Sequence, residues 1–331
     1  MKNLLSEMHQ PFASYACLLV SILAVSSARA AEPNVVSCPS IAGIEFVAIP
    51  AGDFKMGAQH GFFRDERPVT TIHMRSFCIA KRQLHPKDVA GLISVLGDIV
   101  LGLDLSEVGA VEAVLQADGF EVPVRRGKSD LAAALRNFQK ASKLPATGLV
   151  DAATRTALEK VKGRRLSKLS KEADVTWIEA RALADALTRA SGRKVRLPTE
   201  AEWERAARGS LEGMPTPWGG LNQRVNGRLI SDIIDEGLLH CRDFNSSEAK
   251  PHRVPQNSFG VGDLLTNWEW TNTLYAPYPY VATDGRESPD SSKGARSVRG
   301  NGGGAESCKV SVSLRGYSDV SSRYSLRLAV Q

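Results

Sequence analysis

Cysteine is the residue type with the most reactive chemistry in this chain of 331 residues, which contains five of them. They are Cys17, Cys38, Cys78, Cys241 and Cys308. No two have CxxC spacing, no Cys/His cluster has the spacing of a zinc site, and the histidines are scattered. The cysteines therefore point to disulfide bonds or to a single reactive thiol, and not to a zinc centre.

The N-terminal sequence predicts export. The string YACLLVSILAVSSARA, residues 15–30, is a short apolar run that ends in a small-x-small pattern, and Lys2 precedes it. We expect residues 1–30 to be a cleaved signal peptide, with Cys17 inside its apolar core. The alternative is an uncleaved anchor. Cleavage would place the mature chain in the periplasm or cell envelope, with no stable membrane span.

Four cysteines remain after cleavage. An even number in an oxidising compartment predicts two disulfides, although the sequence does not fix how they pair. We prefer Cys38 with Cys78 and Cys241 with Cys308, because each pair lies within one segment of the chain.

Two outer segments must position these residues. In residues 38–89, IEFVAIPAGDFKMGA predicts a β-hairpin and RPVTTIHMRSFCIAK predicts a second strand pair. Residues 175–331 begin with an amphipathic helix in TWIEARALADALTRASG. A second helix follows in RLPTEAEWERAARG, where Thr199 and Glu202 have the capping-box spacing. The rest of this segment is rich in Gly, Pro, Asn and Ser, which predicts loops.

The intervening residues 105–162 predict three helices with a small apolar core of their own. Apolar residues recur at helical spacing in VEAVLQADGF, LAAALRNFQKASKL and PATGLVDAATRTALEKV, and Asp151 is the expected N-cap of the third helix. Residues 163–174 are basic, which favours a solvated linker over a nucleic-acid site, because the rest of the net charge of +6 is spread along the chain. We therefore expect no nucleic-acid partner.

The helical segment resembles the peptidoglycan-binding type 1 domain. The shared pattern runs through VLQADGF and LRNFQKASKLPATGLVDAATRTAL, and the matching positions are Phe138, Gln139, Leu144, Thr147, Gly148, Val150, Thr154 and Leu158. The resemblance implies peptidoglycan as a partner. The alternative is a helical spacer without a ligand.

The outer segments resemble the sulfatase-modifying factor family, which includes the formylglycine-generating enzyme. The family's motifs stand here in its order as FVAIPAGDFKMGA, DERPVTTIHMRSFCIAK, VTWIEARALADAL, RKVRLPTEAEWERAARG, NSFGVGDLLTNWEWT and RSVRG. The resemblance implies an α+β, loop-rich fold related to C-type lectins. The expected architecture is such a domain, in two parts at 38–89 and 175–331, interrupted by a small three-helix all-α domain at 105–162.

The family's chemistry depends on a pair of cysteines. The formylglycine-generating enzyme is a copper-dependent oxidase that converts a substrate cysteine into formylglycine, and two thiolates can hold the soft ion Cu(I). Cys308 has no second cysteine within five residues, so this copper site is not intact. The family's RGGSW string stands as RGNGG from Arg299 to Gly303, without the Ser of the oxygen pocket. If chemistry remains, Cys308 and Trp268 are the candidate catalytic residues.

A Trp-Glu-Trp string survives at Trp268, Glu269 and Trp270. In the family, the Asp and Glu of this loop bind calcium, so the resemblance implies Asp263 and Glu269 as calcium ligands. Carboxylate oxygens suit this hard ion. The loop is one residue shorter than in the family, and the alternative is that both residues are ordinary hydrogen-bonding groups.

The sequence therefore predicts an exported cell-envelope protein with a sulfatase-modifying-factor-like domain, without copper-dependent formylglycine-generating activity, and with a peptidoglycan-binding module. Its rival is a periplasmic oxidative modifying enzyme of the formylglycine-generating or pyoverdine-maturation type, acting on an exported protein or a small molecule. Calcium is the expected cofactor in the first case, and copper or iron would be required in the second.

Overall fold

A computed structural model describes residues 37–85, 87–89, 91–92, 105, 108–120, 122, 124–125, 128–169, 174–233, 255–288, 294–301 and 311–331. The expected signal peptide at residues 1–30 lies outside this set, as do Cys241 and Cys308, so the predictions that rest on them are not tested by the structure.

The chain combines short strands with helices, in agreement with the expected mixed fold class. The helices are α2 (Val108–Ala117), α3 (Leu131–Ala141), α4 (Ala152–Leu169), α5 (Trp177–Ser191), α6 (Glu200–Arg208) and α7 (Ile230–Ile233). The strands are β1 (Ser40–Ile41), β2 (Ile44–Ile49), β3 (Gly52–Met56), β4 (Thr70–Met74), β5 (Phe77–Ala80), β6 (Val124–Arg125), β7 (Lys128–Ser129), β8 (Val195–Arg196), β9 (Arg224–Val225), β10 (Arg228–Leu229), β11 (Trp268–Leu274), β12 (Arg296–Gly300), β13 (Arg315–Ser318) and β14 (Ala329–Val330).

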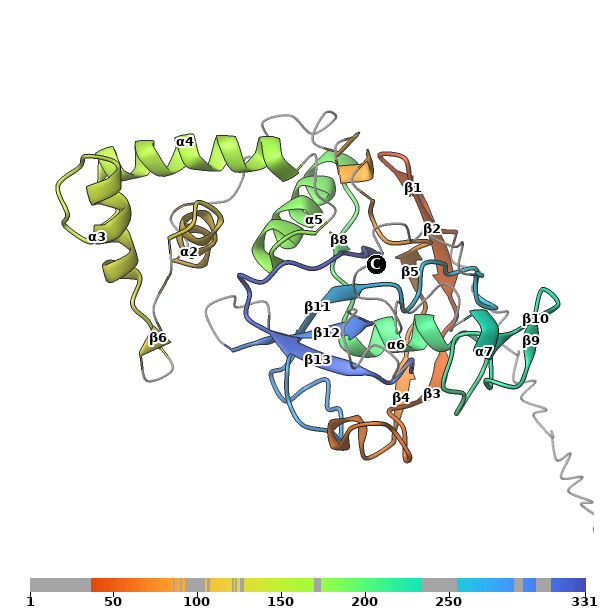
Figure 1. Cartoon of the computed structure of the whole chain (residues 1–331). Coiled ribbons are helices and arrows are strands. Elements are labelled where there is room, and N and C mark those ends of the chain that lie inside the picture. Colours follow the sequence, from red (N-terminus) through yellow and green to blue (C-terminus); the bar gives the residue numbers. More distant parts are fainter. Residues whose placement is uncertain are drawn as a thin grey trace, which may run out of the picture. The chain divides into compact units, whose positions relative to one another are not determined.

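The largest sheet joins the two outer segments of the chain. Its strand order is β1-β2-β5-β14-β8, so strands from the start and from the end of the domain are neighbours (Figure 1). A disulfide links Cys38, just before β1, to Cys78 on β5. This confirms one of the two preferred cysteine pairings.

The strand positions in the first segment were predicted correctly, but their pairing was not. β2 pairs with β1 and β5, and β3 pairs with β4, so neither the predicted hairpin nor the second predicted strand pair forms. Pro50 separates β2 from β3, and a proline has no backbone N–H to continue a ladder. The chain therefore passes from one sheet into another at this point.

A second sheet has the order β11-β12-β13, with antiparallel pairs throughout. Helix α6 packs on β11 and β12 (Figure 1). Strand β12 ends at Gly300, whose φ is 115°. A Cβ atom there would lie 2.2 Å from the carbonyl oxygen of Asn267, so only glycine fits this close approach. Among the residues that the structure describes, this sheet and α6 carry most of the buried charged side chains.

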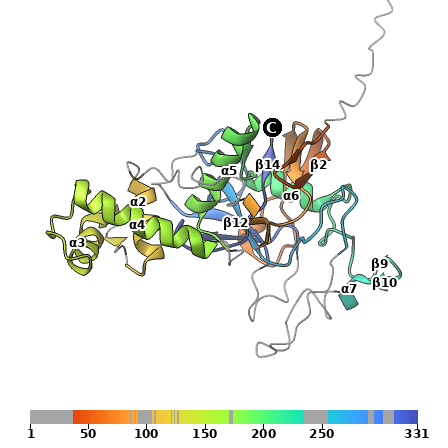
Figure 2. The same cartoon turned by 90° about the horizontal axis from the view of Figure 1, so that it is seen from above.

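Helices α2, α3 and α4 lie next to one another (Figures 1 and 2). Asp130 caps α3, and Asp151 accepts a hydrogen bond of 2.8 Å from the N–H of Thr154, which confirms its predicted capping role. Helix α4 continues to Leu169, across the predicted boundary between residues 162 and 163. The first part of the expected linker is therefore helical.

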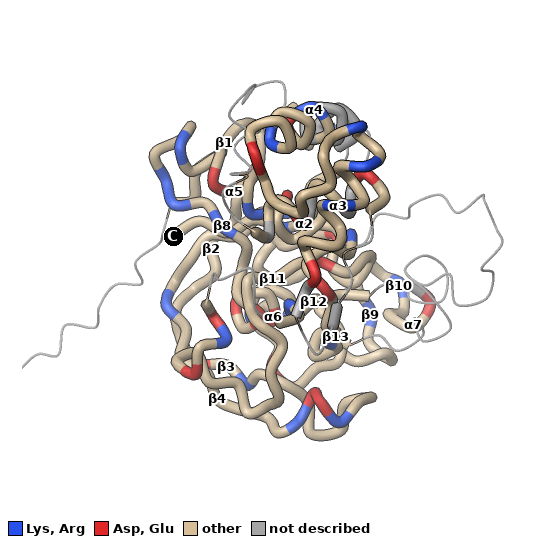
Figure 3. The backbone as a smooth tube through the Cα atoms, turned by 90° about the vertical axis from the view of Figure 1, so that its left-hand side faces the viewer, with Lys and Arg blue, Asp and Glu red and all other residues tan. Residues whose placement is uncertain are grey.

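Lys and Arg occur on α4 and also on other elements, such as the pair of strands β3 and β4 (Figure 3).

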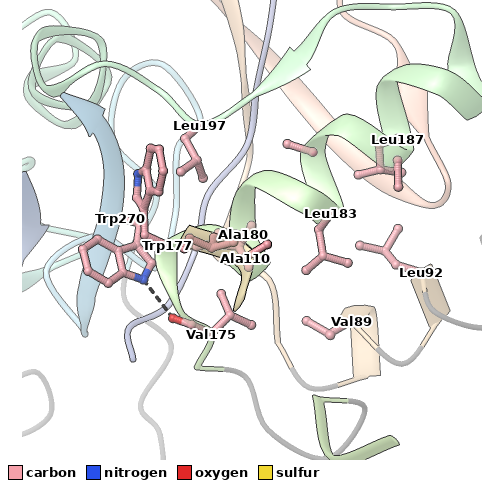
Figure 4. Close-up of a cluster of buried hydrophobic side chains, with 14 of the residues drawn as sticks. Val89, Leu92, Ala110, Val175, Trp177, Ala180, Leu183, Leu187, Leu197 and Trp270 are labelled. Carbon is pink, nitrogen blue, oxygen red and sulfur yellow. Dashed lines mark hydrogen bonds between the residues drawn. The ribbon is translucent and has the colours of Figure 1, made fainter. Parts of the chain in front are cut away.

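One apolar cluster extends from the inserted helices into the outer domain. Ala110 of α2 belongs to it together with Leu183 and Leu187 of α5, and Trp177 and Trp270 are fully buried in it (Figure 4). A separate three-helix domain is thus not shown and stays a prediction. Among the described residues, no helix has both the length and the apolar composition to cross a membrane.

Candidate functional site

Local contacts fix the start of α6, which lies in the string RLPTEAEWERAARG. The N–H of Glu202 donates to the hydroxyl of Thr199 at 3.1 Å, and the N–H of Thr199 donates to the Glu202 carboxylate at 2.8 Å. This is the predicted capping box. Arg196 donates two further bonds of 2.6 and 2.7 Å to the same carboxylate. The helix therefore presents its following residues in a fixed orientation.

Three charged residues of α6 face the interior. Glu200, Glu204 and Arg208 follow one another at intervals of four residues, which places them on one face of the helix, and all are buried. Oε1 of Glu204 accepts bonds from Arg208 at 2.8 and 2.6 Å and from the N–H of Gly57 at 2.7 Å. Arg208 also donates to the carbonyl of Gly57 at 2.7 Å. The helix is thus tied to the chain just after β3.

The β11-β12-β13 sheet brings further charges to this face. Glu269 is opposite Arg299, and Arg299 is opposite Arg315, so the three side chains share one side of the sheet. Arg299 donates to Oε2 of Glu204. Arg315 donates to both oxygens of Glu200, at 2.7 and 2.9 Å. We define the buried charge cluster as Glu200, Glu204, Arg208, Arg299 and Arg315.

Opposite charges offset the cost of burial in this cluster. Burial tends to raise the pKa of Glu204, but Arg208 and Arg299 hold it below its ordinary value. Burial tends to lower the pKa of Arg299, but Glu204 is the largest of the contributions that raise it above its ordinary value. Both groups therefore stay charged, and removal of either one leaves an uncompensated charge in the interior.

Arg299 also links described residues that precede and follow the chain segment containing Cys308. It lies on β12, before that segment, and donates to the carbonyl oxygens of Val312 and Ser313 beyond it, at 2.7 and 3.2 Å. Cys308 itself is outside the described residues. The described residues on either side of its segment are brought together by this one buried guanidinium group.

A further buried carboxylate, that of Glu66, contacts the chain next to Val312. Oε2 of Glu66 accepts a hydrogen bond of 2.5 Å from the hydroxyl of Ser313, which is 2.7 Å from the hydroxyl of Ser311. Oε1 of Glu66 accepts from the N–H of Phe63 at 2.8 Å. Glu66 and Ser313 are fully buried. These contacts join the chain after Cys308 to the loop that follows β3.

The Trp-Glu-Trp string is part of the core. The indole N–H of Trp270 donates to the carbonyl of Val175 at 2.8 Å (Figure 4). Trp268 is partly buried and lies against Gly316. Glu269 is fully buried, and its Oε2 accepts a 2.8 Å bond from the indole N–H of Trp203. All three residues therefore have structural contacts.

The arrangement does not suit Glu269 as a calcium ligand. Arg327 donates to both oxygens of Glu269, at 2.8 and 2.9 Å, and a buried guanidinium would repel a divalent cation at this place. Asp263 is partly exposed, and one of its oxygens lies 3.2 Å from Nε2 of His85. In the part of the chain that is described, no group of three or more His, Cys, Asp or Glu residues is placed to hold a metal ion. Glu269 fits the alternative of an ordinary hydrogen-bonding group.

Sequence reasoning did not find the buried charge cluster. The available signal was the repeat of Glu200, Glu204 and Arg208 at four-residue spacing next to the buried Trp203, together with arginines inside two strands. Charged residues at helical spacing usually form a solvated face. Only the strands that cover this face of α6 show that it is an interior one.

Comparison with known proteins gives the same picture of the fold. A family model described as "Sulfatase-modifying factor enzyme 1-like domain" matches residues 35–327. The formylglycine-generating enzyme of Mycobacterium tuberculosis is 28% identical over 247 residues, which is 71% of this chain and 75% of that protein. The inactive C-alpha-formylglycine-generating enzyme 2 of Mus musculus is 39% identical over 104 residues, which is 31% of this chain and 32% of that protein.

A solved structure with a similar fold is that of PvdO from Pseudomonas aeruginosa. It aligns with a TM-score of 0.50 and 20% sequence identity, over 91% of this chain and 99% of that one. At this level of identity, the likeness concerns the fold alone.

Proposed function

The chain belongs to the sulfatase-modifying factor family, and we propose that it is an exported cell-envelope member without formylglycine-generating activity that binds peptidoglycan through residues 105–162. The copper chemistry of the family requires two neighbouring thiolates. The proposal therefore depends on how the cysteines are used.

The disulfide between Cys38 and Cys78 carries this proposal. It removes two of the four cysteines that follow the expected signal peptide from thiol chemistry. The other two, Cys241 and Cys308, are far apart in the sequence and are not part of a common motif. A relative whose name describes it as inactive, the mouse protein above, supports the idea that a family member can lack the activity.

The test is an oxidation assay on a cysteine-containing sulfatase peptide in oxygen-saturated buffer with added copper, with the Mycobacterium tuberculosis enzyme as the positive control. We expect the peptide mass to stay unchanged with this protein. Conversion of the peptide cysteine, and its loss in a Cys308→Ser variant that melts at the same temperature as the wild type, would contradict the proposal.

The contacts of Gln139 support the resemblance of this segment to the peptidoglycan-binding type 1 domain, but only as regards its fold. Its amide nitrogen, which has two hydrogens to donate, lies 2.9 Å from each of three acceptors on Thr147, Leu149 and Thr154, and its oxygen accepts from the N–H of Gly148 at 2.8 Å. The matched residues thus hold the turn between α3 and α4 in place. Ligand binding is tested separately.

Sedimentation with purified sacculi tests this part of the proposal. We expect the full mature chain to pellet with sacculi at low salt, together with a known wall-binding protein as the control. A variant without residues 105–169 should stay in the supernatant. If the full chain also stays there, the inserted helices are a spacer.

A second candidate function is oxidative modification of an exported protein or small molecule. The observation that favours it is that Arg299 bonds to the carbonyl oxygens of Val312 and Ser313, which brings together the described residues on either side of the segment that contains Cys308. Measurement of the copper and iron content of purified protein separates the two functions. Bound metal together with a free thiol at Cys308 favours the enzyme.

Export and calcium binding are two further parts of the proposal. Mass spectrometry of the secreted protein should show a new N-terminus near Ala31.

Of the two expected calcium ligands, Asp263 is the one that is accessible. A calcium-dependent rise in melting temperature that disappears in Asp263→Asn would therefore support a site there. A melting temperature that is the same in EDTA and in calcium would argue against it.

A further inference from the structure

A cavity of about 740 Å³ is lined in part by Asp263 and by no residue of the buried charge cluster. The chain after β5, the start of β2 and residues 255–263 form most of its lining. Charged residues of both signs line it, namely Glu45, Lys81, Arg82, Asp88 and Asp263. Its volume is in the usual range for small-molecule sites. The cavity is therefore large enough for a ligand with several polar groups.

The backbone of Asp263 is held in an unfavourable conformation. Its φ is 53°, a region that residues other than glycine rarely adopt. The carbonyl oxygen of Asp263 accepts bonds from Gln83 at 2.7 Å and from Thr266 at 3.0 Å, which fix this conformation. Strain that the surrounding structure maintains is frequent at ligand sites. Asp263 is one of the residues that line the cavity, and its side chain is partly exposed.

One carboxylate oxygen of Asp263 is available for a ligand. Its Oδ2 is 3.2 Å from Nε2 of His85, whereas its Oδ1 has no hydrogen-bond partner within the described part of the chain. His85 is about half exposed, so water competes for this contact and it is weak. A ligand cation can therefore reach the carboxylate of Asp263 without displacing a buried partner.

Lys81 is the lining cation that can most readily change partners. Arg82 is fixed by two bonds of 2.6 and 2.9 Å to Asp88. Lys81 bonds at 2.9 Å to Glu45, whose side chain is 69% exposed, and an ion pair of this kind contributes little. The N–H of Gly262 donates to the carbonyl of Lys81 at 2.7 Å. Asp263 follows Gly262 in the sequence. Lys81 and Asp263 therefore lie on backbone segments that are adjacent to each other.

We propose that this cavity binds a short peptide or a free amino acid in its zwitterionic form. The ligand's ammonium group is recognised by Asp263 and its carboxylate by Lys81. The exposed amides of Asn226 and Gln256 also line the cavity and can bond to peptide groups. The chemistry requires both ligand charges, because each end of the ligand has one partner of opposite sign.

Calorimetry and saturation-transfer NMR on the full mature chain test this site, with tri-alanine as the probe. Tri-alanine should bind, and acetylation of its amine or amidation of its carboxylate should each weaken binding roughly tenfold or more. Asp263→Asn and Lys81→Gln should weaken it by a similar factor. The matched controls are Asp53→Asn, whose partner is the exposed His73, and Lys55→Gln, which pairs with Glu212 at the surface. Both controls should bind as the wild type does.

Three results would overturn the proposal. One is the absence of binding at about millimolar tri-alanine. Another is equal binding of the free and the blocked peptides. The third is loss of a calcium signal in Asp263→Asn with no peptide binding to the wild type, which would make the cavity a cation site. The sacculus and copper assays use other residues, so they can succeed or fail independently of this test.

Discussion

The buried charge cluster and the inserted helices use contacts of very different range. Arg299 and Glu204 are 95 positions apart in the sequence, whereas Gln139 and its farthest partner, Thr154, are 15 apart. The first region consists of ionised groups without access to water, and the second is built around a neutral amide. Long-range ion pairs can hold together a domain with few regular elements, but each of them is costly to break.

The difference predicts that single substitutions in the cluster have the largest effects. Arg299→Met should reduce the free energy of unfolding by about 3–5 kcal/mol, because Glu204 and two backbone carbonyls lose a buried partner. Urea denaturation measures this effect. Arg224→Met is the matched control, since Arg224 is exposed and, within the described part of the chain, bonds only to the carbonyl of Gly227. A loss below about 1 kcal/mol would show that the cluster does not hold the domain together.

The disulfide is a covalent long-range contact of the same domain, and its loss should cost somewhat less. Cys38 and Cys78 are 40 positions apart, for which chain entropy predicts a stabilisation of about 2–4 kcal/mol. The double variant Cys38→Ser/Cys78→Ser should show this loss in urea. A reducing agent should then destabilise the double variant further only if Cys241 and Cys308 form a second bridge. Thiol counting by mass spectrometry provides the independent check.

A graded effect is expected in acid. Because the pKa of Glu204 is lowered in the folded state, its contribution is complete above the pKa of the unfolded chain and is lost as the pH falls through the folded value. The free energy of unfolding should therefore decrease with falling pH below the ordinary carboxylate range. Glu204→Gln should be less stable at neutral pH and less sensitive to acid. The exposed Glu212→Gln should follow the wild-type profile; if Glu204→Gln does so too, this carboxylate is not responsible.

The same difference in range explains what the sequence could predict. The capping box of α6 and the Asp151 cap were predictable, because each involves residues three positions apart. Strand positions in the first segment followed from their apolar alternation. The strands that pair with β2 and β5 did not follow from the local sequence. Strand β14, which pairs with β5, and Cys38, which is bonded to Cys78 of β5, are distant from β5 in the sequence.

The candidate site was predictable only in outline. The resemblance led to Glu269 and Asp263, but a sequence does not show that Arg327 holds both oxygens of Glu269. For the same reason, the charges of α6 could not be assigned to the interior. In this domain, the partners of a charged residue depend on the packing of the strands more than on its neighbours in the sequence.

The smallest of these effects is expected in the inserted helices, where one side-chain amide lies within hydrogen-bonding distance of four polar groups. Gln139→Ala should cost about 1–3 kcal/mol, because it leaves buried donors and acceptors in the turn between α3 and α4 without partners. Hydrogen exchange should show faster exchange in α3 and α4, with α6 unchanged. Lys140→Ala, a substitution of an exposed neighbour on α3, is the control and should exchange as the wild type does.

The apolar cluster that links α2 to α5 allows a different outcome. If Gln139→Ala speeds exchange in α6 to the same extent, the helices and the outer domain unfold as one unit, and the contrast between local and long-range stabilisation would not extend to their folding.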